Sequence, residues 1–311
     1  MTKKLEYDQL SADLASVDSI LENIPEDDVL GRIGFEARKH DLELQLRDLE
    51  AHEEHRAAVA LFFGGEPVRG SLGIKSEFAG EALGRFQDMV AKILAQRQIG
   101  NLGQRGIVPH REQATLHLTG VVHGSFGLVL QELQDEPQDP LLATELKLAT
   151  EEAARLVSIF ADEDDDRFTA ALVDSDPRIV NAVGKFVDFI GDNSASVRLV
   201  SNEIDRAFSA ELIVHAAERF RITQIEEIDV ELKGELLGLL PEAHRFEFRE
   251  APIGRIIDGA VAPEIASAEL QEWFRRLGFR RCRARMHVRK VERPGKPFRE
   301  SYTLLGVEAD G

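Results

Sequence analysis

Residues 281–289 alternate between cationic side chains and small or apolar ones. The odd positions hold Arg281, Arg283, Arg285, His287 and Arg289, and the even positions hold Cys282, Ala284, Met286 and Val288. Successive side chains of a β-strand point to opposite faces, so this pattern predicts a strand with one charged face and one face in a core. Such a strand needs neighbouring strands. We therefore expect a β-domain near the C-terminal end.

The surrounding sequence predicts a small barrel. Pro263 and Glu264 open a helix at 264–277, and strands are expected at 228–240, 244–250, 253–261, 279–291 and 300–308. Gly234 and Gly238 interrupt the long first strand, and glycine lets a strand bend sharply around a closed barrel. The order β-β-β-α-β-β resembles the topology of a five-stranded OB-like β-barrel, although SH3-like and other small barrels fit it too.

A helical hairpin is predicted over residues 1–55. Apolar side chains from Leu5 to Ile24 recur three and four residues apart, which is typical of an amphipathic helix, and Pro25 ends that helix. A second helix is expected from about Glu26 onward, with leucines on one side. The outer faces are acidic, and an isolated hairpin has little else to cover its seam. We expect a coiled-coil-like element for oligomerisation or partner docking.

Residues 56–222 are predicted to form a mixed α+β region. Strands are expected at 58–63, 115–119, 126–133 and 196–200, and helices at 76–97, 141–160, 176–191 and 209–220. Two prolines indicate a linker at 134–140. The chain is thus expected to be an α+β protein with an N-terminal helical hairpin, a central mixed α+β domain and, over 223–311, a small five-stranded OB-like β-barrel.

The basic strand lies in a strongly acidic chain. The net charge is −18, yet residues 271–300 hold eleven Lys or Arg against three Glu. A pI near 5.0 argues against broad, non-specific binding to nucleic acid or anionic membranes. Cys282 is the single cysteine, which excludes an intramolecular disulfide and a Cys-based zinc site and favours a cytoplasmic location. No apolar run is long enough to predict a membrane span.

The basic run is the candidate ligand or partner surface. Its residues are Arg281, Arg283, Arg285, His287, Arg289, Lys290, Arg293 and Lys296. Side chains along one strand face repeat every ~7 Å, close to the phosphate spacing of an extended single strand. The competing interpretation is cross-strand pairing with Asp229, Glu231 and Glu235, which alternate on the first strand of the barrel. A third interpretation is docking on the acidic hairpin of another copy.

Other motifs favour ordinary structural roles. Residues 162–166 are all acidic and are expected to form a solvated loop, because contiguous acids point in different directions. His117 and His123 lack an identifiable third metal ligand. Cys282 is expected to face the core, where a thiol is inert. The sequence therefore predicts no catalytic residues, no metal site and no cofactor.

The leading hypothesis is a non-enzymatic assembly, scaffold or recognition protein. It would form homo-oligomers or join a larger complex through the acidic hairpin and the basic barrel. The alternative is a nucleic-acid-binding protein that holds a single strand on the Arg-rich face, and a metal-dependent hydrolase or nuclease is a weaker alternative. Carboxylates within reach of the arginines would favour structural pairing, whereas bare arginines would favour a ligand.

Overall fold

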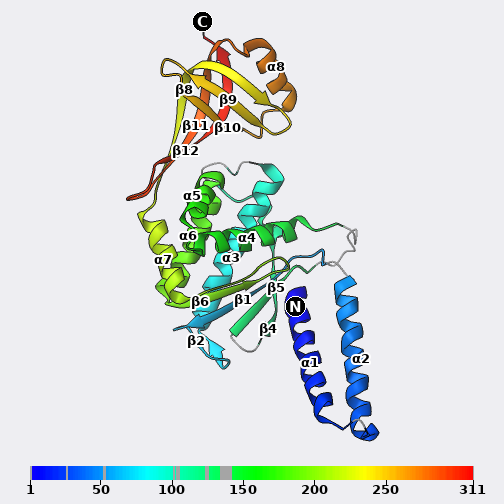
Figure 1. The fold of residues 1–311 in the computed structure, drawn as a ribbon. Helices are drawn as coiled ribbons and strands as arrows, with labels where there is room; N and C mark the ends of the chain where they lie inside the picture. Colours follow the sequence, from blue (N-terminus) through cyan, green and yellow to red (C-terminus); the bar gives the residue numbers. More distant parts are fainter. Residues whose placement is uncertain are drawn as a thin grey trace.

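The computed structural model describes residues 2–25, 27–51, 54–100, 102, 106–122, 126–133 and 142–310. It is a mixed α+β structure with three parts along one long axis: a helical hairpin, a sheet covered by helices, and a closed barrel (Figure 1). The α+β class and a closed five-stranded barrel in the C-terminal region are confirmed. His123 and the linker expected at 134–140 lie outside the described residues.

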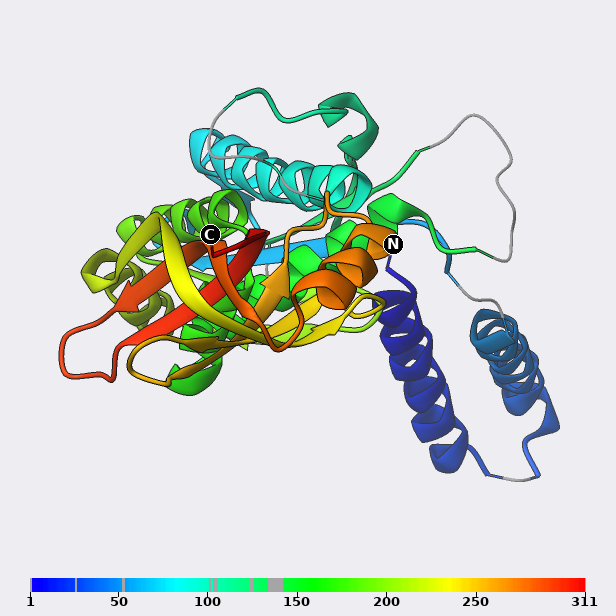
Figure 2. The same cartoon turned by 90° about the horizontal axis from the view of Figure 1, so that it is seen from above.

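Helices α1 (Lys3–Asn23) and α2 (Val29–Ala51) form the hairpin, which projects from one side of the body (Figure 2). Leu42 of α2 is fully buried against apolar side chains of α1. At the base of the hairpin, Leu5 packs on the central sheet. The arm is therefore fixed at one end, and its far end extends away from the rest of the chain.

The central sheet has five antiparallel strands. Across the sheet they run β4 (His117–Val122), β5 (Phe126–Gln131), β1 (Ala58–Gly65), β6 (Ala195–Val200) and β7 (Asp205–Phe208). Leu61 and Phe63 of β1 face the main core, whereas Phe62 faces the small cluster that receives Leu5. The glycine-rich segment after β1 forms a short hairpin of β2 (Val68–Arg69) and β3 (Gly73–Ile74).

Helices cover the core side of this sheet. They are α3 (Ser76–Ile99), α4 (Glu145–Ala161), α5 (Asp165–Asp174), α6 (Pro177–Asp192) and α7 (Ala210–Ile222), with a 3₁₀ turn, η1, at Arg111–Ala114. Phe160, Phe168 and Phe220 contact one another at ring-centroid distances of 5.1 to 5.3 Å. These rings join α4, α5 and α7 near the barrel, so the helical layer is rigid where the barrel rests on it.

The barrel follows α7 directly. Its elements are β8 (Gln224–Leu240), β9 (Arg245–Glu250), β10 (Ile256–Val261), α8 (Ser267–Leu277), β11 (Arg281–Glu292) and β12 (Arg299–Ala309). The strands close in the order β10-β12-β11-β8-β9, with a parallel pairing of β10 and β12. A Cβ on Gly234 would lie 2.0 Å from the carbonyl oxygen of Arg249, which explains the glycine in β8. None of the described helices is long and apolar enough to cross a membrane.

Candidate functional site

Strand β11 has the alternation that the sequence predicts. The even-numbered residues Cys282, Ala284, Met286 and Val288 are buried in the barrel core. On the charged face, the register places acids of β8 opposite cations of β11: Glu231 opposite Arg285, Asp229 opposite His287 and Glu227 opposite Arg289. The charged face of β11 therefore lies against an acidic strand of the same barrel, as the pairing interpretation requires.

The cations on either side of Arg285 are neutralised within the chain. Arg283 lies 3.2 Å from Glu231 and 3.7 Å from Asp310. The Nδ1 atom of His287 lies 2.7 Å from a carboxylate oxygen of Asp229. Two of the three acids that the sequence singles out thus contact the basic run, although Asp229 contacts the histidine and not an arginine.

Arg289 is buried where the barrel meets the central region, with 5% of its surface exposed. It donates hydrogen bonds to two backbone carbonyls at the turn between α5 and α6, and its guanidinium lies 3.3 Å from Glu227. Burial lowers the pKa of Arg289, while the nearby carboxylates, that of Glu227 foremost, raise it. Lys290, the next residue, lies 3.9 Å from Glu300. Arg289 therefore belongs to the junction, not to an exposed face.

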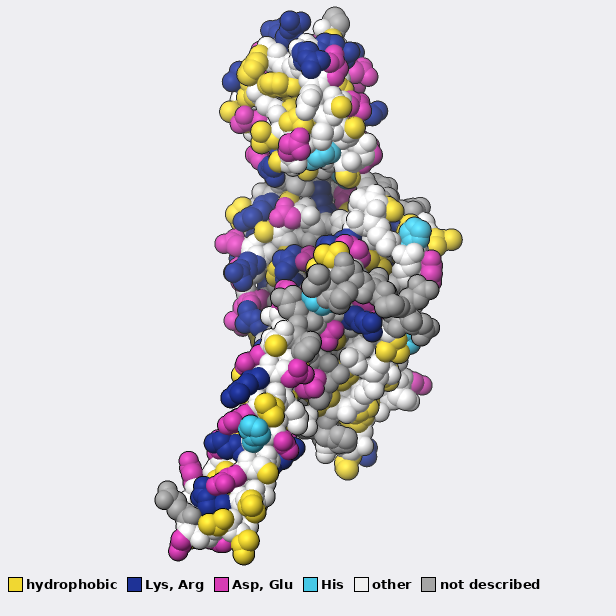
Figure 3. Space-filling view, turned by 90° about the vertical axis from the view of Figure 1, so that its right-hand side faces the viewer, with side chains coloured by type: hydrophobic (Ala, Val, Ile, Leu, Met, Phe, Trp, Pro, Cys, Tyr) yellow, Lys and Arg dark blue, Asp and Glu magenta, His cyan; other side chains and the backbone are white. Residues whose placement is uncertain are grey.

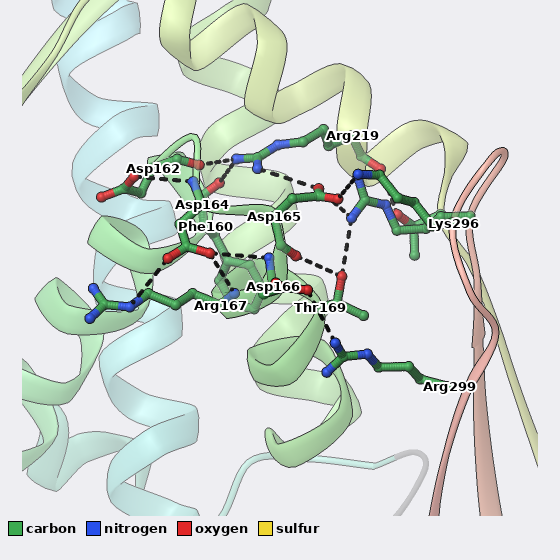
Figure 4. Close-up of polar contacts among 12 residues, drawn as sticks. Phe160, Asp162, Asp164, Asp165, Asp166, Arg167, Thr169, Arg219, Lys296 and Arg299 are labelled. Carbon is green, nitrogen blue, oxygen red and sulfur yellow. Dashed lines mark hydrogen bonds and ion pairs between the residues drawn. The ribbon is translucent and has the colours of Figure 1, made fainter.

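The end of the basic run meets the acids of residues 162–166 at the start of α5 (Figure 4). Arg293 lies 2.6 Å from one carboxylate oxygen of Asp165, and Lys296 lies 2.7 Å from the other. The guanidinium of Arg293 is also 4.9 Å from the ring centroid of Phe168. These contacts hold the loop between β11 and β12 against the central region.

Arg219 of α7 completes this cluster from the other side (Figure 4). It is 4% exposed, donates hydrogen bonds to two backbone carbonyls at the end of α4, and lies 3.9 Å from Asp165. Burial raises the pKa of Asp165, but the hydrogen bonds and positive charges of Lys296 and Arg293 lower it more, so this pKa lies below its ordinary value. Asp165 is therefore ionised and pairs with cations from α7 and from the loop between β11 and β12.

The prediction of a solvated loop at residues 162–166 is correct for residues 162–164, which precede the helix, but Asp165 and Asp166 form the first turn of α5. Asp164 caps α5 by accepting hydrogen bonds from two backbone N–H groups of the first turn, and the acids that follow it face cations of the barrel and of α7. The sequence did contain a signal for this helix. A capping acid is followed by Phe168 and Leu172, which are four residues apart and fully buried.

Arg281 and Arg285 differ from the rest of the basic run. Both side chains are exposed, and neither makes an ion pair or hydrogen bond with any residue that the structure describes. Glu235 lies opposite Arg281 in the register but pairs with Arg249 at 3.1 Å. The predicted ladder is therefore incomplete at two places, at Arg281, where β11 begins, and at Arg285, between the paired residues Arg283 and His287.

Further cations without partners lie beside Arg281, in the segment that joins α8 to β11. Arg276 and Arg280 are exposed and make no side-chain ion pair within the described part of the chain. Between them, Phe279 exposes 69% of its surface. We call Arg276, Phe279, Arg280 and Arg281 the distal basic patch. Sequence analysis did not identify this patch, because it considered the alternating positions of β11 and not the segment that precedes them.

A second uncovered surface lies on α2. The apolar or neutral residues of this face are Leu30, Ile33, Ala37, His40 and Leu44, all exposed, which we call the outer seam. They lie on the side of α2 opposite Leu42, whose side chain faces α1. Because 3.6 residues make one helical turn, positions 42 and 44 are about 200° apart. The hairpin thus covers one apolar face of α2 and leaves the other in solvent.

Two features of the described residues bear on catalysis: a cavity at the junction and the buried thiol of Cys282. A cavity of about 410 Å³ at the junction is lined in part by Glu227, Asp229 and His287. Both ring nitrogens of His287 face carboxylates, Nδ1 at 2.7 Å from Asp229 and Nε2 at 4.0 Å from Glu227. Cys282 is buried, as predicted, and burial raises the pKa of its thiol. Within the described ranges, no three His, Cys, Asp or Glu side chains gather as metal ligands.

Comparison with known proteins gives no assignment for these surfaces. No protein-family model matches the chain, no curated protein matches it, and no solved structure matches it.

Proposed function

We propose that this is a cytoplasmic, non-enzymatic assembly or recognition protein whose docking element is the α1–α2 hairpin. One observation carries the proposal: the outer seam of α2 is uncovered on an arm that projects from the body, and hydrophobic side chains gather toward the free end of that arm (Figure 3). Leu30, Ile33 and Leu44 expose 87%, 63% and 48% of their surfaces. Contiguous exposed apolar side chains of this kind mark interaction sites.

The spacing of the outer seam supports helix-to-helix docking. Its residues follow one another at intervals of three and four, from Leu30 to Leu44, which is the repeat of a coiled-coil face. Full burial of a Leu or Ile side chain is worth about 1.5–3 kcal/mol, so completing the burial of the three large residues offers on the order of 4 kcal/mol. A partner helix would gain enough from this seam to repay part of the cost of association.

We interpret the chain as three domains, at 1–55, 56–222 and 223–311, and the last as an OB-like barrel. The strand order, the parallel pairing of β10 with β12 and the helix between the third and fourth strands support this interpretation. In OB barrels the loop between the last two strands contacts ligands. Here Arg293 and Lys296 of that loop contact Asp165, which favours a structural role for the barrel.

Binding of a single-stranded nucleic acid to the Arg-rich face has less support. Most of its cations contact acids of the same chain, and Phe246 and Phe248 are 3% and 0% exposed, so these rings offer no stacking platform on β9. Residues 223–311 hold 15 Lys and Arg against 16 Asp and Glu. The barrel as a whole therefore lacks the net positive charge that draws polyanions.

The test of the proposal is the particle mass of the chain purified without denaturation from the cells that make it. We expect species heavier than the 34.7 kDa chain for the wild type, alone or with a bound partner. The double variant Leu30→Glu, Ile33→Glu should run as the single chain. Leu72→Glu, at a position 91% exposed in the short hairpin after β1, is the matched control and should behave as the wild type. Equal masses for all three proteins would contradict the proposal.

A further inference from the structure

We infer that the occupant of the outer seam is the distal basic patch of a second copy of this chain. The inference rests on the proposed function and names the partner in it. The hairpin and α8 lie at opposite ends of the long axis (Figure 1), so one molecule cannot bring its own two surfaces together. The patch supplies an aromatic ring and arginines, and the seam supplies an apolar row flanked by acids.

Phe279 gives the distal basic patch an unusual centre. Its φ of +56° lies in the left-handed region, which bulky residues rarely adopt. The backbone N–H of Phe279 donates a 2.9 Å hydrogen bond to the carbonyl of Leu236, and its ring meets Phe274 at a centroid distance of 5.7 Å. Even so, 69% of the residue is exposed. A strained backbone that presents an aromatic ring to solvent is typical of a recognition site.

Arginines border that ring on both sides. Arg276 precedes it in the last turn of α8, and Arg280 and Arg281 follow it directly. None of the three side chains is paired with a residue in the described part of the chain. Arginine and aromatic residues are enriched among the anchors of protein interfaces. The patch therefore requires a partner that is both apolar and acidic.

The outer seam of α2 has that composition. Glu36, Asp41 and Glu43 occupy the helix positions that flank the seam. Of the basic residues of the helix, Lys39 lies 2.7 Å from Asp18 of α1 and Arg32 lies 3.0 Å from Glu36, whereas Arg47 follows the last residue of the seam by three positions. The exposed face of α2 is thus an apolar row between acids, which matches a ring between arginines in both polarity and charge.

The same acids argue against pairing of two outer seams. In a parallel or an antiparallel pair of α2 helices, Glu36, Asp41 and Glu43 would meet acids of the other copy, and like charges across an interface disfavour the contact. A contact between the seam of one copy and the patch of the next has no such repulsion. It is heterologous, so repetition of the contact builds either a closed ring or an open filament.

The test uses two variants, each of which blocks one surface. Leu30→Glu, Ile33→Glu removes the seam but keeps the patch, and Arg276→Glu, Phe279→Asn, Arg280→Glu removes the patch but keeps the seam. Asparagine tolerates the left-handed conformation at position 279, so the backbone turn is preserved. All side chains changed are exposed, and circular dichroism is the control that each variant is folded.

Each variant alone should run as a 34.7 kDa particle at a micromolar concentration at which the wild type forms larger species. A mixture of the two variants should form particles of twice that mass and no larger, because each pair retains one intact contact. Raising NaCl from low to high concentration should weaken this pairing by about tenfold. Arg69→Glu, which changes an exposed arginine of β2, is the matched control and should assemble as the wild type.

The outcomes distinguish failure of this inference from failure of the proposed function. If the wild type assembles through the seam but the two variants do not pair, the distal basic patch of a second copy is not the occupant of the seam, and hairpin docking still stands. If the Leu30→Glu, Ile33→Glu change leaves the mass of the native species unaltered, both the proposed function and the inference are overturned.

Discussion

Asp165→Asn tests whether ion pairs at α5 hold the barrel on the central region. The substitution keeps the size of the side chain but removes the charge that faces Arg293, Lys296 and Arg219. The side chains of Arg293 and Arg219 are 6% and 5% exposed. Without the carboxylate, two buried guanidinium groups lie near each other and share no counter-charge.

The expected loss follows from the burial of these partners. Removing one member of a buried ion pair costs about 3–5 kcal/mol. The side chain of Asp165 is 28% exposed, so water screens part of the interaction, and we expect a loss of about 2–3 kcal/mol. Asp166→Asn is the matched control in the same helix turn. Its side chain is 93% exposed and lies 3.2 Å from Arg299, so this pair is worth at most about 1 kcal/mol.

The assay is urea unfolding of the full chain, followed by circular dichroism, together with amide exchange of α5 and of the loop between β11 and β12. Asp165→Asn should lower the free energy of unfolding and speed exchange in both segments, whereas Asp166→Asn should change little. If the two variants differ by less than about 0.5 kcal/mol, the reasoning is refuted, because exposed and buried pairs would then contribute equally.

Comparison of the wild type with Asp165→Asn also gives a pH dependence of known sign. The pKa of Asp165 is lowered in the folded chain. Its stabilisation is therefore present above the ordinary Asp pKa of about 3.9 and is lost as the pH falls through the lower folded value. The stability difference between the wild type and Asp165→Asn should be constant near neutral pH and should shrink below about pH 4. A difference that grows in acid would contradict this assignment of the charge.

Three further outcomes test the fold and the candidate sites. Gly234→Ala places a methyl group 2.0 Å from the carbonyl oxygen of Arg249 and should cost about 3 kcal/mol in urea unfolding, whereas Gly238→Ala, whose nearest atom lies at 3.7 Å, should cost less than about 1 kcal/mol. The thiol of Cys282 is 0% exposed, so a thiol reagent should modify it after denaturation but not before. Leu42→Ala opens a cavity between α1 and α2 and should destabilise the hairpin by about 2–5 kcal/mol, seen as faster amide exchange confined to these helices.

The barrel was predictable because its signals are local. Alternation along residues 281–289 identified β11, and the glycines of β8 indicated a strand that bends around a closed barrel. The expected strands and the helix between them are found within a few residues of their predicted limits. Phe246 and Phe248, which alternate with charged residues along β9, are buried. A strand with a two-residue alternation can be predicted from adjacent positions alone, without knowing which distant residues pack against it.

The junction could not be predicted in the same way. Its two halves, Asp165 and Arg293, are far apart in the sequence, and each half carries an ordinary charge pattern. The choice of partner depends on how α5, α7 and the barrel stack, which local periodicity does not encode. The cross-strand pairing that the sequence suggested involves acids of β8, and it gave no partner for Arg293 and Lys296, which contact Asp165.

The excess of Lys and Arg near the C-terminal end therefore consists of two groups: cations that pair with acids of the same chain, and cations that stay exposed. Of the eight cations in the predicted surface, all but Arg281 and Arg285 contact acids that come from other segments of the chain. The local excess of positive charge in the sequence is thus mostly balanced by acids that the fold brings close from other segments. What remains after pairing is informative about partners. Arg281 is one of three exposed arginines beside Phe279, whereas Arg285 lies farther along β11, and the distal basic patch is at the far end from an arm whose free face is apolar and acidic. Internal pairing accounts for neither surface, whereas the proposed contact between copies would bury both.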